Sequence, residues 1–320
     1  MNILQRGVRI IRQRGIGELL RRIIFQVIRV LLLRNRIITP YFKYVFGNEF
    51  HLKALSYLAL GYWPDIQNLR TFNEKILYRQ LYSKNDLFST VECKYESREY
   101  IADRVGESIL PNLYHVTEDP NTIPFDSLPD EYVVKPTHLA GAVAIVDEDE
   151  SPDRDAIKDD CRRWLSEEFG AVSEQYWYQE IEPRIMVEER LRDAEYDPPL
   201  DYKFYVFNGR VEYVHVDFDR GSDPTRRFFD RDWTPQTFTK GRVPLGPAID
   251  EPERFDEMME VAEKLGEEFD FIRVDLYLLN GDRIVFGELT VGPANGTSPF
   301  SPRHYDYEFG ELWEQRQNHK

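Results

Sequence analysis

The sequence has only two cysteines among its 320 residues, Cys93 and Cys161, and they lie in unrelated contexts. They form neither a disulfide framework nor a cysteine-based metal motif, which favours a reducing compartment. The chain also lacks a G-x-S-x-G motif, a P-loop and a cysteine paired with a histidine in a family pattern. These absences argue against the nucleophile-based hydrolases and the P-loop nucleotide-binding proteins.

No long apolar run is free of charge. The most apolar stretch, 19–33, is interrupted by three arginines, so it fits neither a membrane span nor a secretory signal. Residues 1–50 hold ten basic and two acidic residues, whereas the remainder holds 31 basic and 55 acidic residues. We expect residues 1–50 to form a basic amphipathic helix on an anionic membrane surface. The alternative is a terminal helix that packs on the acidic body of the protein. The negative charge of that body argues against nucleic acid as the general partner.

Helical and β patterns follow one another irregularly along the rest of the chain, which indicates an α+β fold. The residues from Thr71 to Glu74 resemble a capping box that opens a helix. Residues 221–250 are rich in Gly, Pro, Asp and Arg and predict a long loop. The expected helices are Phe72–Leu81, Val91–Val105, a helix from an N-cap at Ser151 to about Phe169, and Glu253–Phe269.

The segment Phe271–Thr290, FIRVDLYLLNGDRIVFGELT, predicts a β-hairpin. Its Asn280-Gly281 dipeptide is the one that a type I′ turn prefers, because both central residues of that turn need positive φ. A two-residue turn sets the register, and side chains alternate between the two faces of the hairpin. The apolar face is expected to hold Ile272, Val274, Leu276, Leu278, Val285 and Leu289.

The polar face of this hairpin carries Arg273, Asp275, Glu288 and Thr290. In the predicted register Arg273 faces Glu288, and Asp275 and Glu288 are diagonal neighbours. Two close carboxylates repel each other unless a cation lies between them, and hard oxygen ligands suit Mg²⁺ or Mn²⁺. The alternative is a solvated sheet face with an Arg273–Glu288 surface pair.

Other predicted strands present charge in the same way. Lys135 ends a β-branched strand, Glu188-Glu189 ends another, and Asp201 shares one strand face with Lys203. A lysine at a strand end can hold a phosphate, and each of these groups in isolation is more often a solvated surface charge.

The ordered set of charged strands resembles the ATP-grasp superfamily, and more narrowly its TupA-like family. The matching phrases are TFNEKILYRQLY, KYESREYIADRVGE, FDSLPDEYVVKPTH, PRIMVEERL, DYKFYVFNGRVEYVHVDFDR, FIRVDLYLLNGDRIVFGELT and HYDYEFGELW, which cover residues 70–315. The resemblance implies two α+β lobes whose antiparallel sheets hold Mg-ATP between them. It also implies a basic segment at 1–50, a helical region at 51–130, the first lobe at 131–191 and the second lobe, with the metal-binding hairpin, at 192–320.

The resemblance also assigns roles to residues. It implies that Arg98 and Lys135 bind nucleotide phosphates, that Glu188, Glu189 and Leu191 form the adenine hinge, and that Asp201 contacts ribose. It implies that Lys203 faces the γ-phosphate or acceptor, that Arg273 stabilises the transferring group, and that Asp275, Glu288 and Thr290 hold the metal. Arg220 and Arg226 are expected to orient an acidic acceptor. The phosphate-covering loop after Lys135 reads THLAGAVAIV, in which His138 and Gly141 are the remaining candidates for nucleotide contact.

The function implied is an ATP-dependent carboxylate–amine ligase in cell-surface glycan or glycopeptide synthesis. Its partners would be a small-molecule or glycan carboxylate and an amine, and its location the cytoplasm or the inner membrane face. The family loop after Lys135 is usually rich in glycine and serine, whereas this one keeps Gly141 as its only glycine, beside the small Ala140 and Ala142. Two alternatives therefore stay open, a sugar kinase or transferase of the same fold and a membrane-docked scaffold without turnover.

Overall fold

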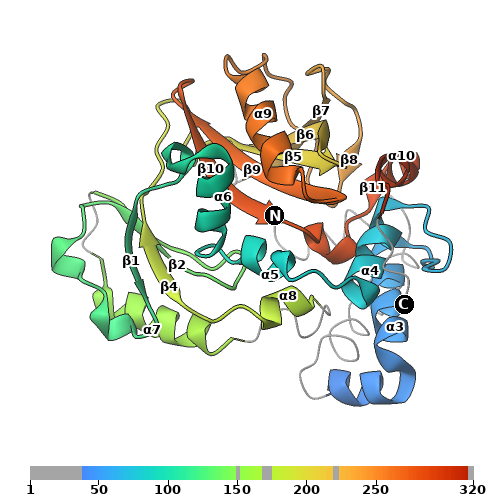
Figure 1. The fold of residues 1–320 in the computed structure, drawn as a ribbon, viewed down its shortest axis with the longest axis horizontal. Coiled ribbons are helices and arrows are strands. Elements are labelled where there is room, and N and C mark those ends of the chain that lie inside the picture. The colour runs from blue at the N-terminus through green and yellow to red at the C-terminus, as the bar shows by residue number, and fades with distance from the viewer. Residues whose placement is uncertain (1–37, 149–151, 168–174, 219–222, 316–320) are drawn as a thin grey trace, which may run out of the picture.

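The computed structural model describes residues 38–148, 152–167, 175–218 and 223–315 of the chain (Figure 1). The helices are α3 Ile38–Leu60, α4 Phe72–Tyr82, α5 Leu87–Glu92, α6 Ser97–Val105, α7 Arg154–Leu165, α8 Tyr176–Gln179, α9 Phe255–Gly266 and α10 His304–Leu312. The strands are β1 Leu113–Thr117, β2 Tyr132–Pro136, β3 Ala144–Val146, β4 Ile185–Glu188, β5 Asp201–Phe207, β6 Arg210–Phe218, β7 Thr225–Asp230, β8 Thr239–Lys240, β9 Phe271–Leu279, β10 Arg283–Thr290 and β11 Phe300–Ser301.

Two antiparallel sheets dominate the structure. One has four strands in the order β1-β4-β2-β3, and the other has five in the order β10-β9-β5-β6-β7. Helix α7 packs on the four-stranded sheet, and α9 packs on the outer face of the five-stranded sheet. Figure 1 shows α5, α6 and α8 between the two sheets, with α3, α4 and α10 grouped at one side. The expected α+β architecture of two sheets that face each other is therefore observed.

Helix α9 positions the five-stranded sheet through an apolar stripe. Phe255, Met258, Ala262 and Leu265 are fully buried on that sheet, as their helical spacing predicts. The facing side chains come from alternate positions of the strands, including Tyr202, Phe204 and Val206 of β5. Period-two alternation then leaves the charged residues of the same strands on the opposite face.

The β9–β10 hairpin forms where it was predicted, but its register differs. Asn280 and Gly281 both have positive φ, and Asp282 N–H donates to the Leu279 carbonyl, as in the expected turn. Leu279 nevertheless pairs with Arg283, and a β-bulge at Gly287 shifts the register again. Beyond the bulge, Asp275 pairs with Glu288 and Arg273 with Thr290, so the predicted register was wrong.

Gly287 explains the second of these two shifts, since the first is already present where Leu279 pairs with Arg283. A Cβ at this position would lie 3.0 Å from the Tyr277 ring and 3.1 Å from the Asp275 carbonyl, so the bulge needs a glycine. The bulge also changes which β10 side chains face the core. Ile284, Phe286 and Leu289 join the apolar cluster under α9, whereas Val285, which was expected there, does not.

Helix α4 joins the beginning of the described chain to its end. Thr71 caps the helix, and Glu74 completes the capping box, as the sequence predicts. Phe72 then packs against the rings of Phe271, Phe300, Phe309 and Trp313. Two turns further on, Arg79 is buried and donates to the carbonyls of Phe271 and Val291, at the two ends of the hairpin. Helices α4 and α10 therefore clamp the open end of the hairpin.

Four secondary-structure expectations were wrong. The expected helix Val91–Val105 is two helices, α5 and α6, separated by a turn at Cys93–Glu96. Asp153 caps α7 by accepting from Ala156 N–H, so the helix begins later than predicted. The predicted loop 221–250 contains the edge strand β7, and the region expected to be helical, 51–130, contains β1.

Most of the predicted basic helix, residues 1–37, lies outside the described residues. Residues 38–50 form the first half of α3, which has a non-helical Gly47 inside it. Among the described residues, no helix has both the length and the apolar character needed to cross a bilayer.

Candidate functional site

The five-stranded sheet carries a row of charges across three adjacent strands, on the face opposite α9. Glu288 of β10 pairs with Asp275 of β9, and Asp275 pairs with Lys203 of β5. On β5, Asp201 lies two residues before Lys203 and therefore on the same face. Paired positions on neighbouring strands bring their side chains within contact distance. The sheet thus gathers four of the predicted site residues that are far apart in the sequence.

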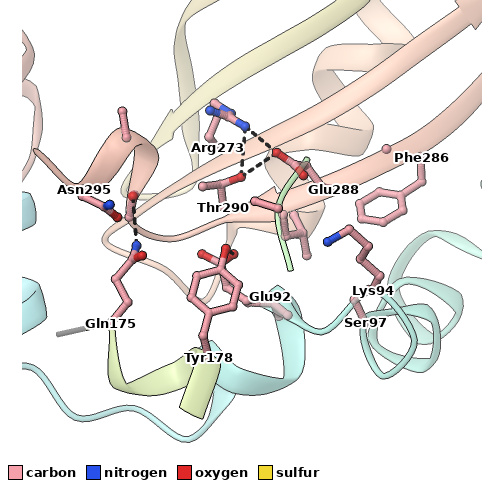
Figure 2. Close-up of a pocket in the computed structure, with 16 residues that line it drawn as sticks. Glu92, Lys94, Ser97, Gln175, Tyr178, Arg273, Phe286, Glu288, Thr290 and Asn295 are labelled. Carbon is pink, nitrogen blue, oxygen red and sulfur yellow. Dashed lines mark hydrogen bonds and ion pairs between the residues drawn. The ribbon is translucent and has the colours of Figure 1, made fainter. Parts of the chain in front are cut away.

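Arg273 contacts two of the three carboxylates of this row, Asp275 and Glu288. Its Nε lies 2.6 Å from Asp275 Oδ1 and its Nη2 lies 2.7 Å from Oδ2. The same Nη2 lies 2.7 Å from Glu288 Oε1 and 3.0 Å from the hydroxyl of Thr290 (Figure 2). All four predicted polar residues of the hairpin therefore contact one another through one guanidinium.

Lys203 forms the second cationic contact of the row. Its Nζ lies 2.7 Å from Asp201 Oδ2 and also donates to Asp275 Oδ2. Asp201 and Asp275 are almost completely buried. Burial lowers the pKa of Lys203, but Asp201 and Asp275 outweigh that effect and raise it above its ordinary value. Lys203 is therefore a fixed ammonium ion at the floor of the site.

The two hairpin carboxylates differ in their environments. Burial raises the pKa of Asp275 above its ordinary range, although Arg273 and Lys203 act in the opposite direction. The Glu288 side chain is 41% exposed. Against the effect of burial, Arg273, Lys203 and Lys94 lower the pKa of Glu288 to about 2. Glu288 is thus a carboxylate that is charged and open to solvent.

A pocket of about 230 Å³ lies in front of Arg273, Glu288 and Thr290. Its opposite wall contains side chains that were not predicted from the sequence. The pocket-lining residues missed by sequence reasoning include Glu92, Lys94, Ser97, Gln175, Tyr178 and Asn295 (Figure 2). They come from the ends of short helices and from a loop, where hydrophobic periodicity gives no signal.

Glu92 and Lys94 connect this wall to both sheets. Glu92 accepts from Val291 N–H at 2.7 Å and from the Tyr178 hydroxyl. Lys94 Nζ donates to the carbonyl of Leu139 at 2.6 Å, which holds the loop after Lys135. Burial lowers the pKa of Lys94. Glu288 acts to raise this pKa, and Lys135 acts to lower it. Lys94 therefore lies within electrostatic reach of a charge from each sheet.

The four-stranded sheet brings together three further predicted residues. Lys135 Nζ forms an ion pair with Glu188 Oε1 across the β2–β4 pairing. Arg98 of α6 donates to the Pro111 carbonyl at 2.9 Å. Burial lowers the pKa of Arg98, and the nearby Glu188 carboxylate acts in the opposite direction. Arg98, Lys135 and Glu188 therefore form a second charged cluster.

The remaining predicted nucleotide residues have other contacts. Both Glu189 carboxylate oxygens accept from the Arg283 guanidinium, with Nη2–Oε2 at 2.9 Å. Glu189 also accepts from Asn112 N–H. It therefore joins β10 to the end of β4. His138 is buried, and burial lowers its pKa. Gly141 is exposed, with φ +75° and no atom near a Cβ position, and Leu191 is partly exposed.

Two predicted acceptor residues lie beyond the row. Arg226 of β7 forms a two-point contact with Asp217 of β6, with Nη2–Oδ2 at 2.9 Å. This guanidinium is therefore paired within the sheet. Arg220, the other predicted acceptor residue, lies outside the described residues.

Lys240 is a buried cation near the same end of the sheet. Its Nζ lies 5.5 Å from the centre of the Phe72 ring and 5.4 Å from that of Phe300. Burial, with Arg226 and Arg273 adding to its effect, lowers the pKa of Lys240 to about 7. No sequence pattern marked this lysine, because it lies in a two-residue strand inside the predicted loop.

Comparison with known families agrees with this arrangement. The model of the TupA-like ATP-grasp family matches residues 74–314, which include all the described charged residues of both clusters. The chain belongs to the TupA-like ATP-grasp family. Its fold is accordingly the α+β ATP-grasp fold, with a helical segment before it. None of the curated proteins compared with it matches the chain.

Several solved ATP-grasp ligases resemble the structure. D-alanine–D-alanine ligase from Bacillus anthracis, solved with ATP, is 16% identical, with 65% of this chain and 57% of the ligase covered and a TM-score of 0.40. The ligase PsnB, solved with a precursor variant, Mg and ADP, is 14% identical, covers 64% and 52%, and has a TM-score of 0.36. A Chryseobacterium gregarium RiPP-associated ligase, solved with ADP and leader and core peptide, is 13% identical, covers 74% and 64%, and has a TM-score of 0.39. The chain thus spans little more than half the length of the first two.

The ATP-grasp family implies a magnesium ion, and the hairpin has the donor chemistry to hold one. Among the described residues, no three His, Cys, Asp or Glu side chains form a metal cluster. Magnesium, however, needs only one or two protein carboxylates when phosphates and water complete its shell. Glu288 is charged and solvent-exposed beside the Thr290 hydroxyl. Asp275 lies opposite Glu288 and shares its oxygens with Arg273 and Lys203.

Proposed function

We propose that the protein is an ATP-dependent, ADP-forming carboxylate–amine ligase that acts on a cell-envelope glycan, a glycopeptide or one of their precursors. The observation that carries this proposal is the row from Glu288 through Asp275 to Lys203, bound together by Arg273 at the wall of a pocket. Positively charged groups aimed at one place stabilise the charge that develops in phosphoryl transfer. The family's nucleotide chemistry and the absence of a nucleophile motif in the sequence support the same reaction.

The nucleotide would lie between the two charged clusters. We assign Arg98 and Lys135 to the α- and β-phosphates, because both cations interact with Glu188 in the second charged cluster. Glu188 would orient Lys135, and the chain through Leu191 would border the adenine. Asp201 is buried against Lys203, which supports a positioning role for Asp201 in place of the ribose contact.

In the first step, an oxygen of the acceptor carboxylate attacks the γ-phosphorus, and the bond from that phosphorus to the ADP oxygen breaks. Lys203 and Arg273 are placed to neutralise the transferring phosphoryl group. In the second step, the amine attacks the acyl carbon, loses a proton and expels inorganic phosphate. A bound magnesium ion would supply Lewis-acid neutralisation of phosphate charge, held by Asp275, Glu288 and Thr290. The chain supplies position and charge, and no protein nucleophile is needed.

The test is turnover of Mg-ATP with panels of uronic acids and amino acids, with ADP release and product mass measured together. We expect ADP to form only when both a carboxylate and an amine are present, with an amide as product. A phosphorylated sugar with no amide would establish the kinase alternative instead. Nucleotide binding without any ADP above background would establish the scaffold alternative. Lys203→Met is the matched inactive control, because it removes the cation that pairs with Asp201 and Asp275 in the charged row.

A further inference from the structure

The first helix and the loop after it carry a concentrated apolar surface. Of the thirteen large hydrophobic side chains that are exposed in the described part of the chain, eight lie between residues 38 and 63. Isolated exposed hydrophobic residues are normal in soluble proteins, whereas a contiguous group marks an interaction surface. The eight are Ile38, Tyr41, Tyr44, Val45, Phe46, Phe50, Tyr57 and Trp63.

Five aromatic rings of this region form a continuous series, which we call the aromatic ladder: Phe42, Phe46, Phe50, Trp63 and Tyr57. Successive ring centres are 4.8, 5.5, 5.5 and 6.0 Å apart. Four of the five rings, all except Phe42, have exposed fractions between 41% and 54%. The ladder is therefore an ordered apolar strip that keeps about half of its area in contact with solvent.

The opposite face of α3 is already buried. Leu52 and Leu55 pack with Ile66 and Leu77 in a separate small core against α4. This packing holds the part of α3 after Gly47, and Phe42, the first ring of the ladder, packs at the edge of the same core. Figure 1 shows α3 at the side of the molecule away from the five-stranded sheet. A surface bound to the ladder would leave the proposed ligase pocket accessible.

The charge around the ladder identifies the kind of surface that fits it. Residues 1–63 carry eleven Lys and Arg against two Glu, whereas the remaining residues carry 30 Lys and Arg against 55 Asp and Glu. Lys53 lies over the Trp63 ring at 5.7 Å, with its charge beside the apolar strip. Amphipathic rings bordered by cations are the composition that settles at the interface of an anionic bilayer.

We propose that the aromatic ladder of α3 inserts into the interfacial layer of an anionic phospholipid membrane, and that the basic residues before it bind the lipid headgroups. A second copy of this chain is a poorer occupant, because two strongly basic ends would face each other. Residues 1–37 of the same chain are also a poorer occupant of this surface. They carry nine arginines, whereas residues 38–63 offer one acidic partner, Glu49, which already accepts from the Tyr82 hydroxyl. The proposal does not depend on the ligase reaction.

Trp63 provides a direct probe of this surface. The protein has five tryptophans, and the other four, Trp164, Trp177, Trp233 and Trp313, are buried. Quenching by brominated phospholipid should therefore report Trp63 almost selectively. We expect vesicles of phosphatidylcholine with phosphatidylglycerol to shift the full-length protein's emission to shorter wavelength, and brominated lipid to quench it. The same measurement on Trp63→Phe should show neither change, although that variant should still sediment with the vesicles.

Two further variants test the ladder itself. Phe46→Ser/Phe50→Ser should lower the vesicle partition coefficient by about tenfold or more, since both apolar rings are lost from the inserted strip. Tyr114→Ser/Leu245→Ser, which removes two similarly exposed side chains elsewhere, should leave partitioning unchanged. Both variants remove two side chains that are about half buried, so the thermal unfolding of each is measured and partitioning is compared below both transitions.

Three results would overturn the proposal. Equal binding to vesicles of phosphatidylcholine alone and to anionic vesicles would remove the electrostatic component. An emission shift that depends on protein concentration without lipid would assign the ladder to a second copy of the chain. Resistance of Trp63 to acrylamide in lipid-free protein would mean that another segment of the same chain covers it.

Discussion

Replacement of Lys203 by Met tests the charged row as a structural unit. The Lys203 ammonium lies 2.7 Å from Asp201 and also bonds Asp275, and both carboxylates are almost completely buried. Loss of the cation leaves those carboxylates with one fewer positive partner. Breaking a buried ion pair in this way costs about 3–5 kcal/mol of unfolding free energy. For a chain of 320 residues, an unfolding entropy of about 0.7 kcal/mol per kelvin converts that cost into a fall in Tm of roughly 4–7 °C.

Differential scanning calorimetry at pH 7 without nucleotide measures this effect independently of catalysis. The double variant Lys203→Met/Asp201→Asn should regain much of the lost stability, because one unpaired carboxylate has been neutralised. Lys264→Met on the exposed side of α9 is the matched control and should stay within about 1 °C of the parent. If Lys203→Met itself stays within that range, the row is a solvated surface feature and the reasoning fails.

Three other substitutions make separate predictions. Asp275→Asn should lower turnover by at least about 10²-fold, and a fully active variant would reject its place in the site. Tm should fall less than in Lys203→Met, because Lys203 keeps Asp201 and Arg273 keeps Glu288. Gly287→Ala should destabilise the protein by roughly 1–3 kcal/mol, measured by urea unfolding, because the new methyl group meets the Tyr277 ring; unchanged stability would contradict the tight bulge. Lys240→Met should stabilise the protein by a few kcal/mol near pH 7. The pKa of Lys240 is lowered to about 7 in the folded protein, so the unfolded chain binds more protons until the pH reaches the ordinary pKa of lysine. The gain should therefore shrink as the pH rises toward about 10, and a gain that is constant with pH would contradict the burial argument.

The hairpin illustrates what local sequence can predict about the site. Asn280 and Gly281 specify their turn through the sign of φ, which depends on those two residues. The register depends on all the paired residues of the two strands, and the bulge at Gly287 lies in close contact with Tyr277 and Asp275 on the partner strand. A glycine inside a strand is the available signal for a bulge, but it accounts for one of the two residues by which Glu288 is displaced relative to Asp275, because the pairing of Leu279 with Arg283 supplies the other.

Tertiary pairing explains the residues that the sequence did not reveal. Lys203 meets Asp275 because β5 and β9 are neighbours, although the two residues are 72 positions apart in the sequence, with α9 between them. Strand β7 escaped prediction because Arg226 and Arg227 interrupt its apolar alternation, and Asp217 on β6 neutralises the first of them. Lys94 lies in a turn between two short helices, so its contact with the loop at Leu139 follows from the three-dimensional fold and has no local pattern.

The contacts of α4 have a consequence for the order in which the protein folds. Lys75 donates to the Gly310 carbonyl across 235 residues, and Phe72 packs on rings from the same late segments. A growing chain on the ribosome therefore exposes the apolar side of α4 until α10 has emerged. Closing a loop of that length costs about 5 kcal/mol of chain entropy, which the aromatic cluster must supply in a late step. The hairpin with its charged row would consequently become rigid only after translation has passed α10.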